Sequence, residues 1–157
     1  MKPLHIVLLL ILTAACESIE CTITNVVYAT YGFYAVEDGE TTAVTVLDTI
    51  TVTAAGTDSV LVNKYYSQTE VELPMSYTAE TDTLVFQFTD SLGYSRYDTI
   101  WVTKENTQHY ESPDCPAAMF HYVTGVAWTH NLIDSVVIVK PDINYNVTEN
   151  FRIYFRS

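Results

Sequence analysis

The histidines and cysteines are the residues of this chain whose types could bind a metal or attack a substrate. His121 and His130 are nine residues apart, and an odd separation on one unbroken strand directs two side chains to opposite faces. Only a bulge at Gly125 would bring them to the same face. The 157 residues contain no His-Glu-x-x-His pair and no Gly-x-Ser-x-Gly nucleophile turn. We therefore expect no metal site, no cofactor and no catalytic residue, and predict that the protein is not an enzyme.

The carboxylates leave one catalytic alternative open. The chain has 19 Asp and Glu residues, and two suitably placed carboxylates are the machinery of glycoside hydrolysis. No feature of the sequence selects such a pair. A carboxylate-dependent hydrolase is therefore kept as an alternative to a non-catalytic role.

Five aspartates occur in a repeated phrase, in which Asp is followed by Ser or Thr and then by apolar residues. We expect each to lie where a strand begins and to cap the adjoining turn. The alternative is that several gather at one end of the fold and bind Ca²⁺, which takes about six to eight oxygen ligands. No Asp-x-Asp-x-Asp-Gly loop is present. The five residues are Asp48, Asp58, Asp82, Asp98 and Asp134.

Two adjacent tyrosines, Tyr65 and Tyr66, are candidate ligand-binding residues. They stand between Lys64 and Ser67, in a segment that we expect to be an exposed loop. Exposed tyrosines can stack on sugar rings, which would suit a glycan-binding accessory protein. The alternative is that these rings pack in the core or pair across strands, as most aromatic residues of a β-sheet do.

The start of the chain has the pattern of a secretory signal peptide. Lys2 precedes an apolar run from Leu4 to Leu12, and small residues follow. The run is shorter than the roughly 20 apolar residues that span a bilayer. Small residues directly before Cys16 predict that this cysteine carries lipid and becomes the first residue after cleavage. The alternative is ordinary cleavage that leaves Cys16 as a plain thiol.

Lipid on Cys16 would anchor the protein to a membrane and would leave Cys21 and Cys115 as the two remaining cysteines. An even number of thiols in an oxidising compartment favours a disulfide. Two separate buried thiols are the alternative. The location that we expect is the cell envelope, and within it the outer membrane.

Composition and charge limit the partners of the protein. The formal net charge is −12, and nucleic-acid binding requires basic surfaces, so we expect no nucleic-acid partner. The chain is rich in Thr, Val and Tyr, which favour β-strands, and it contains no linker between domains. We predict a signal peptide over residues 1–15, a lipidated cysteine with a short tether over 16–21, and a single domain over 22–157.

Short apolar segments separated by turns predict about eight or nine strands in this domain. Their spacing is typical of an all-β, antiparallel β-sandwich with Greek-key, immunoglobulin-like connections. The segment "DTLVFQFTD" places Leu84, Phe86 and Phe88 on one face, and "YDTIWVTKE" is its expected hairpin partner. Residues 106–116 are expected to be a loop.

The last third of the chain predicts three more strands. The segment "AAMFHYVTGVAWTH" is expected to place four residues on one face, and residues 133–143 are apolar on both faces, as in a central strand. In "FRIYFR", Phe151, Ile153 and Phe155 are expected to point inward, with Arg152, Tyr154 and Arg156 outward. The four residues of the first segment are Phe120, Tyr122, Val126 and Trp128.

Several of these segments together resemble a family of small uncharacterised lipoproteins from Bacteroidota. The resemblance is carried by Cys16 and Cys21, by Ser112-Pro113 with Cys115, by "IDS" at residues 133–135, and by Asn150 with Ile153-Tyr154. Pro116 departs from the pattern, in which Gly would follow the cysteine. The family has no established activity, so the resemblance implies an envelope location and transfers no functional residue.

Together these observations predict an envelope-anchored lipoprotein that acts as a non-catalytic binding or structural module with an unidentified ligand. Its expected partners are a membrane, through the lipid, and a glycan or another envelope protein. A surface glycan-binding accessory protein and, less favoured, a hydrolase are the alternatives.

Overall fold

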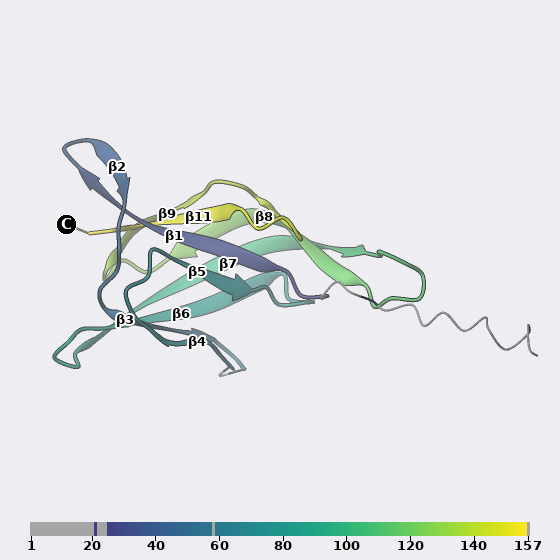
Figure 1. Cartoon of the computed structure of the whole chain (residues 1–157), viewed down its shortest axis with the longest axis horizontal. Helices are drawn as coiled ribbons and strands as arrows, with labels where there is room; N and C mark the ends of the chain where they lie inside the picture. Colours follow the sequence, from purple (N-terminus) through teal and green to yellow (C-terminus); the bar gives the residue numbers. More distant parts are fainter. Residues whose placement is uncertain (1–20, 22–24, 58, 157) are drawn as a thin grey trace, which may run out of the picture.

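The computed structural model describes residues 21, 25–57 and 59–156, which form two β-sheets packed face to face (Figure 1). These residues contain eleven strands and no helix, so the predicted all-β sandwich is confirmed, with more strands than expected. None of the described residues forms a helix that could cross a membrane. The strands are β1 (Tyr28–Glu37), β2 (Glu40–Ala43), β3 (Thr49–Ala54), β4 (Ser59–Tyr65), β5 (Glu70–Pro74), β6 (Thr81–Thr89), β7 (Ser95–His109), β8 (Ala118–Trp128), β9 (Ile133–Ile138), β10 (Asp142–Ile143) and β11 (Glu149–Phe155).

The two sheets differ in how their strands are paired. The five-stranded sheet has the order β2-β1-β11-β9, with β5 beside the first half of β1. The six-stranded sheet has the order β10-β8-β7-β6-β3-β4 and is antiparallel throughout. The predicted hairpin of β6 and β7 is confirmed, with nine paired residues on each strand.

One strand pair departs from the antiparallel expectation, because β1 and β11 run parallel. Their register shifts between Thr30 and Tyr31, and the Asn150 side chain fills the irregularity. Asn150 Oδ1 accepts a hydrogen bond from the Thr30 amide at 3.1 Å, while Nδ2 donates to the carbonyls of Lys140 and Asp142 at 3.1 Å each. One buried amide thus joins three segments of chain.

The core lies between the sheets and is built by residues that alternate along the strands. Phe86 and Phe88 of β6 face Tyr31 of β1 and Phe151 of β11, and all four are fully buried. The Tyr31 and Phe151 rings stack with centroids 4.6 Å apart. Each such side chain contributes about 1.5–3 kcal/mol when it leaves water. The predicted inward face of β11 is confirmed for Phe151 and Ile153, which are fully buried.

Two faces were predicted wrongly, and each error has a local cause. In β8, Thr103 pairs with Gly125 but Lys104 pairs with Val123, so Thr124 is an extra residue that reverses the alternation. Val123 is therefore buried, while Tyr122, predicted to lie with Phe120 on one face, is 49% exposed. In the second case β9 is an edge strand rather than a central one, and its Val137 is 46% exposed.

The strands β7 and β8 extend beyond the rest of the sandwich as a hairpin that we call the β7–β8 arm (residues 107–120; Figure 1). Part of this segment was expected to be loop, but β7 continues to His109. The His109 ring stacks on Phe120 with centroids 4.2 Å apart, and Tyr145 packs edge-on against both rings. These cross-strand contacts account for the longer strand.

The predicted disulfide between Cys21 and Cys115 is present, with the two Cα atoms 5.7 Å apart. It joins the beginning of the described chain to the turn of the β7–β8 arm. Cys16, the expected lipidation site, lies outside the described residues, as do the signal peptide and most of the tether.

Candidate binding groove

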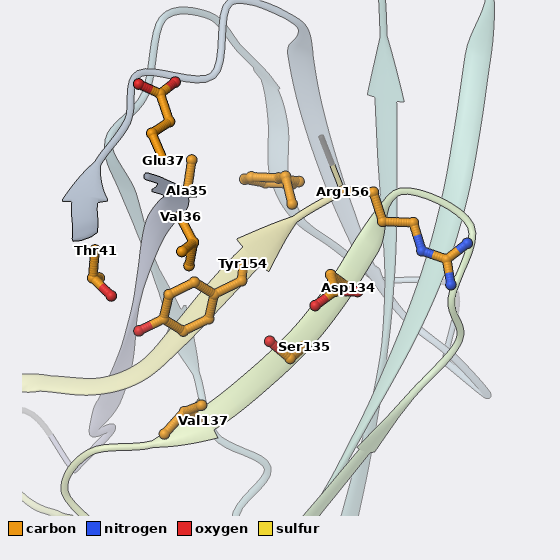
Figure 2. Close-up of a pocket in the computed structure, with 10 residues that line it drawn as sticks. Ala35, Val36, Glu37, Thr41, Asp134, Ser135, Val137, Tyr154 and Arg156 are labelled. Carbon is orange, nitrogen blue, oxygen red and sulfur yellow. The ribbon is translucent and has the colours of Figure 1, made fainter. Parts of the chain in front are cut away.

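A hollow on the five-stranded sheet opens where β1 separates from β11. The two strands pair from Thr30 to Tyr34, after which β1 pairs only with β2 on its other side. The β1–β2 hairpin turns through Asp38 and Gly39, both with positive φ, and it projects away from the rest of the sheet (Figure 1). The wedge left between β1 and β11 has a volume of about 760 Å³, and we call it the groove (Figure 2).

Three segments supply the side chains of the groove. Figure 2 shows the Tyr154 ring reaching from β11 toward Val36 of β1 and Thr41 of β2, with Ser135 and Val137 of β9 on the other side. The full lining is Ala35, Val36, Glu37, Thr41, Asp134, Ser135, Val137, Tyr154, Phe155 and Arg156. All but Arg156 belong to strands, so the lining is held by sheet hydrogen bonds.

The groove combines exposed apolar surface with hydrogen-bonding groups. Val36 is 54% exposed and Val137 is 46% exposed, although both stand on strands. Glu37 and Asp134 are exposed, and Thr41 and Ser135 contribute hydroxyl groups to the lining. A ligand with an apolar face and several hydroxyl groups would match this surface.

Next to the groove, a cluster of three side chains holds Tyr34 in place. Glu149 accepts a hydrogen bond from the Tyr34 hydroxyl at 2.5 Å and one from Arg152 Nε at 2.6 Å. The Arg152 guanidinium lies 4.7 Å from the centre of the Tyr34 ring. The hydrogen bond to Glu149 raises the pKa of Tyr34 above its usual value. Gly32 makes the arrangement possible, because a Cβ atom there would lie 2.5 Å from Glu149 Oε2.

This cluster lies against Tyr154, one of the two aromatic residues that line the groove. The Tyr34 and Tyr154 rings lie side by side on the same face of the sheet, with centroids 5.8 Å apart. Because Tyr34 is fixed by Glu149, it restricts the rotamers open to Tyr154. The polar groups of the cluster are paired with one another.

The tyrosines predicted as ligand-binding residues lie elsewhere. Tyr65 and Tyr66 are 51% and 64% exposed at the end of β4, in the six-stranded sheet. Tyr65 lines a separate hollow of about 470 Å³ together with Tyr28 and Pro74. The expectation that both are exposed is correct, but the expected loop is wrong for Tyr65, which is the last residue of β4. Neither tyrosine lines the groove.

The strand-start aspartates do not form one site. Asp48 pairs with Arg96 at 3.2 Å, Asp82 lies 3.6 Å from Lys104, and Asp134 lines the groove. Asp58 lies outside the described residues. In the described part of the chain, no three His, Cys, Asp or Glu side chains gather as a metal site would require.

Asp98 has a different role from the one its position in the repeated phrase suggested. It is the fourth residue of β7, faces inward and is 1% exposed. Its carboxylate accepts hydrogen bonds from Thr129 Oγ1 at 2.6 Å and from the amides of Asn131, Leu132 and Ile133 at 2.7–3.0 Å. Asp98 therefore caps the turn between β8 and β9. It does not cap its own turn.

Lys104, six residues after Asp98 on β7, was missed by the sequence analysis. It is 2% exposed, and its ammonium donates to Ser76 O at 3.1 Å, to Asn106 Oδ1 at 3.3 Å, and to the carbonyl of Ala79. Asp82 supplies the opposite charge. Burial lowers the pKa of Lys104, and Asp82 opposes that shift. The signal was available, since Asp98, Ile100, Val102 and Lys104 alternate on one face of β7.

The histidines occupy separate environments. His121 is 4% exposed, and its Nδ1 lies 2.7 Å from Asn106 Oδ1. Burial, and then the nearby charge of Lys104, lower the pKa of His121 to about 4. His130 accepts a hydrogen bond from Trp128 Nε1 at 3.2 Å in the turn after β8. The bulge that could have aligned the two histidines is present at Thr124, yet each ring has its own partners.

The fold and the groove define a small β-sandwich domain with a shallow polar and aromatic hollow on one sheet. The chain belongs to a family of unknown function (DUF6452), whose model matches residues 49–155. This range includes β9 and β11 of the groove but not β1 and β2. No curated protein and no solved structure is detectably similar to the chain.

Proposed function

We propose that this protein is an envelope-anchored lipoprotein whose sandwich is a non-catalytic binding module, and that the groove is its binding site. The observation that carries the proposal is the exposure of Val36 and Val137 beside hydroxyl and carboxylate groups on a rigid sheet. Single exposed apolar residues are common on any protein surface. A hollow lined by apolar side chains together with hydrogen-bonding groups is typical of ligand-binding sites.

The anchor is supported by the pattern of the first 16 residues and by the resemblance to Bacteroidota lipoproteins. The Cys21–Cys115 disulfide is in keeping with an oxidising compartment outside the cytoplasm. We place the protein at the outer membrane. A lipid with two or more acyl chains suffices for stable attachment.

Metabolic labelling with palmitate tests the anchor. We expect the wild type to incorporate label and Cys16→Ala to lose it. Cys115→Ala is the matched control, because it removes a cysteine of the disulfide and keeps the lipidation site. Label that persists in Cys16→Ala would contradict the proposal.

A non-catalytic role fits the carboxylates of the groove. Glu37 and Asp134 are both exposed to solvent. Glycosidases need one carboxyl group that stays protonated near neutral pH, and burial in an apolar pocket is the usual means. Exposed carboxylates are better suited to accepting hydrogen bonds from ligand hydroxyls.

A neutral glycan is the ligand class favoured by one specific observation, the position of Tyr154 between two apolar residues and several acceptors. Stacking on the ring would bury the apolar face of a sugar, and the groove carboxylates would accept from its hydroxyls. The acidic chain, with a net charge of −12, disfavours anionic polysaccharides.

Affinity electrophoresis in gels containing a neutral polysaccharide, such as a glucan, a xylan or a mannan, tests this ligand class. We expect at least one of these polymers to retard the wild type and to retard Tyr154→Ala much less. Tyr97→Ala is the control, since Tyr97 is 51% exposed on β7 and outside the groove. Equal retardation of the two variants would exclude Tyr154 from the site.

A further inference from the structure

We propose that the Cys21–Cys115 disulfide orients the sandwich at the membrane, with the β7–β8 arm toward the lipid and the groove away from it. The proposal rests on the proposed lipid anchor at Cys16. It assigns the disulfide a role in directing the groove away from the membrane, besides its role in stability.

The first argument is the position of the disulfide on the molecule. Cys115 lies in the turn of the β7–β8 arm, and β6 pairs with β7 only as far as Thr103. The arm therefore projects beyond the neighbouring strand, at one end of the long axis of the molecule (Figure 1). A chain tethered through Cys21 is held by this projecting end.

The second argument is that the arm is braced, so that a pull at its turn acts on the whole sandwich. Tyr77 donates a hydrogen bond from its hydroxyl to Ala117 O at 2.8 Å, which joins the arm to the loop between β5 and β6. Asn106 donates to the carbonyls of Thr78 and Ala79 in the same loop, at 3.2 and 3.1 Å. The stack of His109 on Phe120 links the two strands of the arm.

The third argument is the length of the tether. Five residue steps separate Cys16 from Cys21, which limits the distance between them to roughly 18 Å. Without the disulfide, the first buried residue among those that the structure describes is Val27, which is 3% exposed and accepts a hydrogen bond from the Met75 amide. Eleven steps lead from Cys16 to Val27, so the tether could then reach roughly 40 Å. The disulfide therefore halves the reach.

The groove lies at the opposite end of the molecule. The strand β1 runs from Tyr28, near the arm, to Glu37 at the groove, and β11 runs in the same direction (Figure 1). The strand β7 runs between the same two ends of the molecule, and its fifteen residues span about 48 Å at the usual rise of a strand. The groove is thus separated from the arm turn by more than the tether can bridge.

The charge of the arm indicates that it stands off the bilayer and does not insert. Residues 107–120 include Glu111 and Asp114 and contain no Lys or Arg. Anionic headgroups repel such a segment, and docking on them requires clusters of basic residues. We infer that the arm acts as a spacer between the lipid and the sandwich.

Energy transfer in vesicles tests the orientation. The full-length lipidated protein is reconstituted with p-azidophenylalanine at Tyr110 of the arm or at Tyr94 in the β6–β7 turn, and a donor dye is attached. These tyrosines are 59% and 71% exposed at opposite ends. Acceptor dye is placed on the lipid headgroups. We expect stronger transfer from position 110 than from position 94, and equal transfer from both would overturn the proposal.

Two variants separate orientation from stability. Cys21→Ser with Cys115→Ser is expected to lose most of the difference between the two positions. An insertion of ten Gly and Ser residues after Glu20 keeps the disulfide and should reduce the difference as well. An undiminished difference in the insertion variant would overturn the proposal even if the cysteine variant does not fold. Failure to co-float with vesicles is a different result, since it would refute the anchor itself.

Discussion

Two residues of β7, six positions apart, place opposite charges in the interior of the sandwich. Asp98 and Lys104 both face inward on this strand, with Ile100 and Val102 between them, and both are almost fully buried. Asp98 is surrounded by donors from the turn between β8 and β9. Lys104 is surrounded by carbonyl oxygens of the loop between β5 and β6, with Asp82 nearby.

The two charges differ in the part of the molecule that each of them positions. The turn that Asp98 caps leads directly into Asp134, Ser135 and Val137, which form one wall of the groove. The loop that Lys104 holds braces the β7–β8 arm through Tyr77. A buried charge is weak evidence for net stability, but it defines one arrangement of the groups around it. We infer that Asp98 fixes the groove and that Lys104 fixes the arm.

The largest expected effect comes from removing the cation. Lys104→Met leaves Asp82 and several carbonyls buried without their partner, and we expect a loss of about 3–5 kcal/mol in the free energy of unfolding. Chemical denaturation measures it. Lys140→Met is the control, because Lys140 is exposed, and it should change stability by less than about 0.5 kcal/mol. Similar losses in both variants would show that Lys104 does not hold the loop.

Removing the Asp98 carboxylate should lower the free energy of unfolding slightly less than removing the Lys104 ammonium does. Its structural effect should fall on the groove. Asp98→Ala leaves four donors without their acceptor, and we expect a loss of about 3 kcal/mol. Hydrogen exchange would locate the change: amides 131–133 should lose protection more than those of the arm. Uniform loss of protection over these amides and the arm would contradict a local role for Asp98.

Acidification should weaken the region around Lys104. His121 has a pKa of about 4 in the folded state and an ordinary value of 6.5 when unfolded. Above pH 6.5 His121 is neutral in both states, and its protonation does not affect the free energy of unfolding. As the pH falls from 6.5 toward 4, only the unfolded state takes up the proton, and the free energy of unfolding decreases. We expect a loss of up to about 3 kcal/mol across this interval.

Denaturation curves at pH 7 and pH 4.5 check this expectation. His121→Gln should reduce the difference between the two curves, since Gln can still bond to Asn106 and does not titrate. The half-buried His109 and the His130 of the β8–β9 turn remain in both proteins. A pH dependence unchanged by the substitution would assign the effect to groups other than His121.

The smallest expected effect concerns a buried polar group that lacks the partners that Asp98 and Lys104 have. Among the described residues, the Tyr31 hydroxyl is buried with no hydrogen-bond partner, unlike the charged groups of Asp98 and Lys104. Tyr31→Phe removes the unpaired group and keeps the stack on Phe151. We expect stability to rise by about 1 kcal/mol, as measured by thermal or chemical unfolding. A decrease would show that the hydroxyl is satisfied.

The sequence was sufficient for the fold class, since alternation within single strands identified β6 and β11 and their inward faces. The disulfide followed from counting cysteines. Features made by distant segments were not predictable from local pattern. The bulge at Thr124, the edge position of β9 and the separation of β1 from β11 all depend on which strands become neighbours.

The groove illustrates the limit most directly, because its two sides are about a hundred residues apart in the chain. Exposure in a loop favoured Tyr65, whereas the groove uses Tyr154, a residue correctly predicted to face outward but not recognised as part of a site. Lys104 was in phase with Ile100 and Val102, and this signal was overlooked because buried lysines are rare.

The central claim, that the groove is the binding site, is tested most directly by comparing two valines of equal exposure. Val36 in the groove is 54% exposed and Val60 on β4 is 55% exposed, so replacing either by Asp should disturb folding to a similar, small extent. In affinity electrophoresis with the neutral polysaccharide that retards the wild type most, we expect Val36→Asp to migrate freely and Val60→Asp to be retarded like the wild type. Retardation of Val36→Asp equal to that of the wild type, or absence of retardation by every neutral polysaccharide, would contradict a glycan site in the groove.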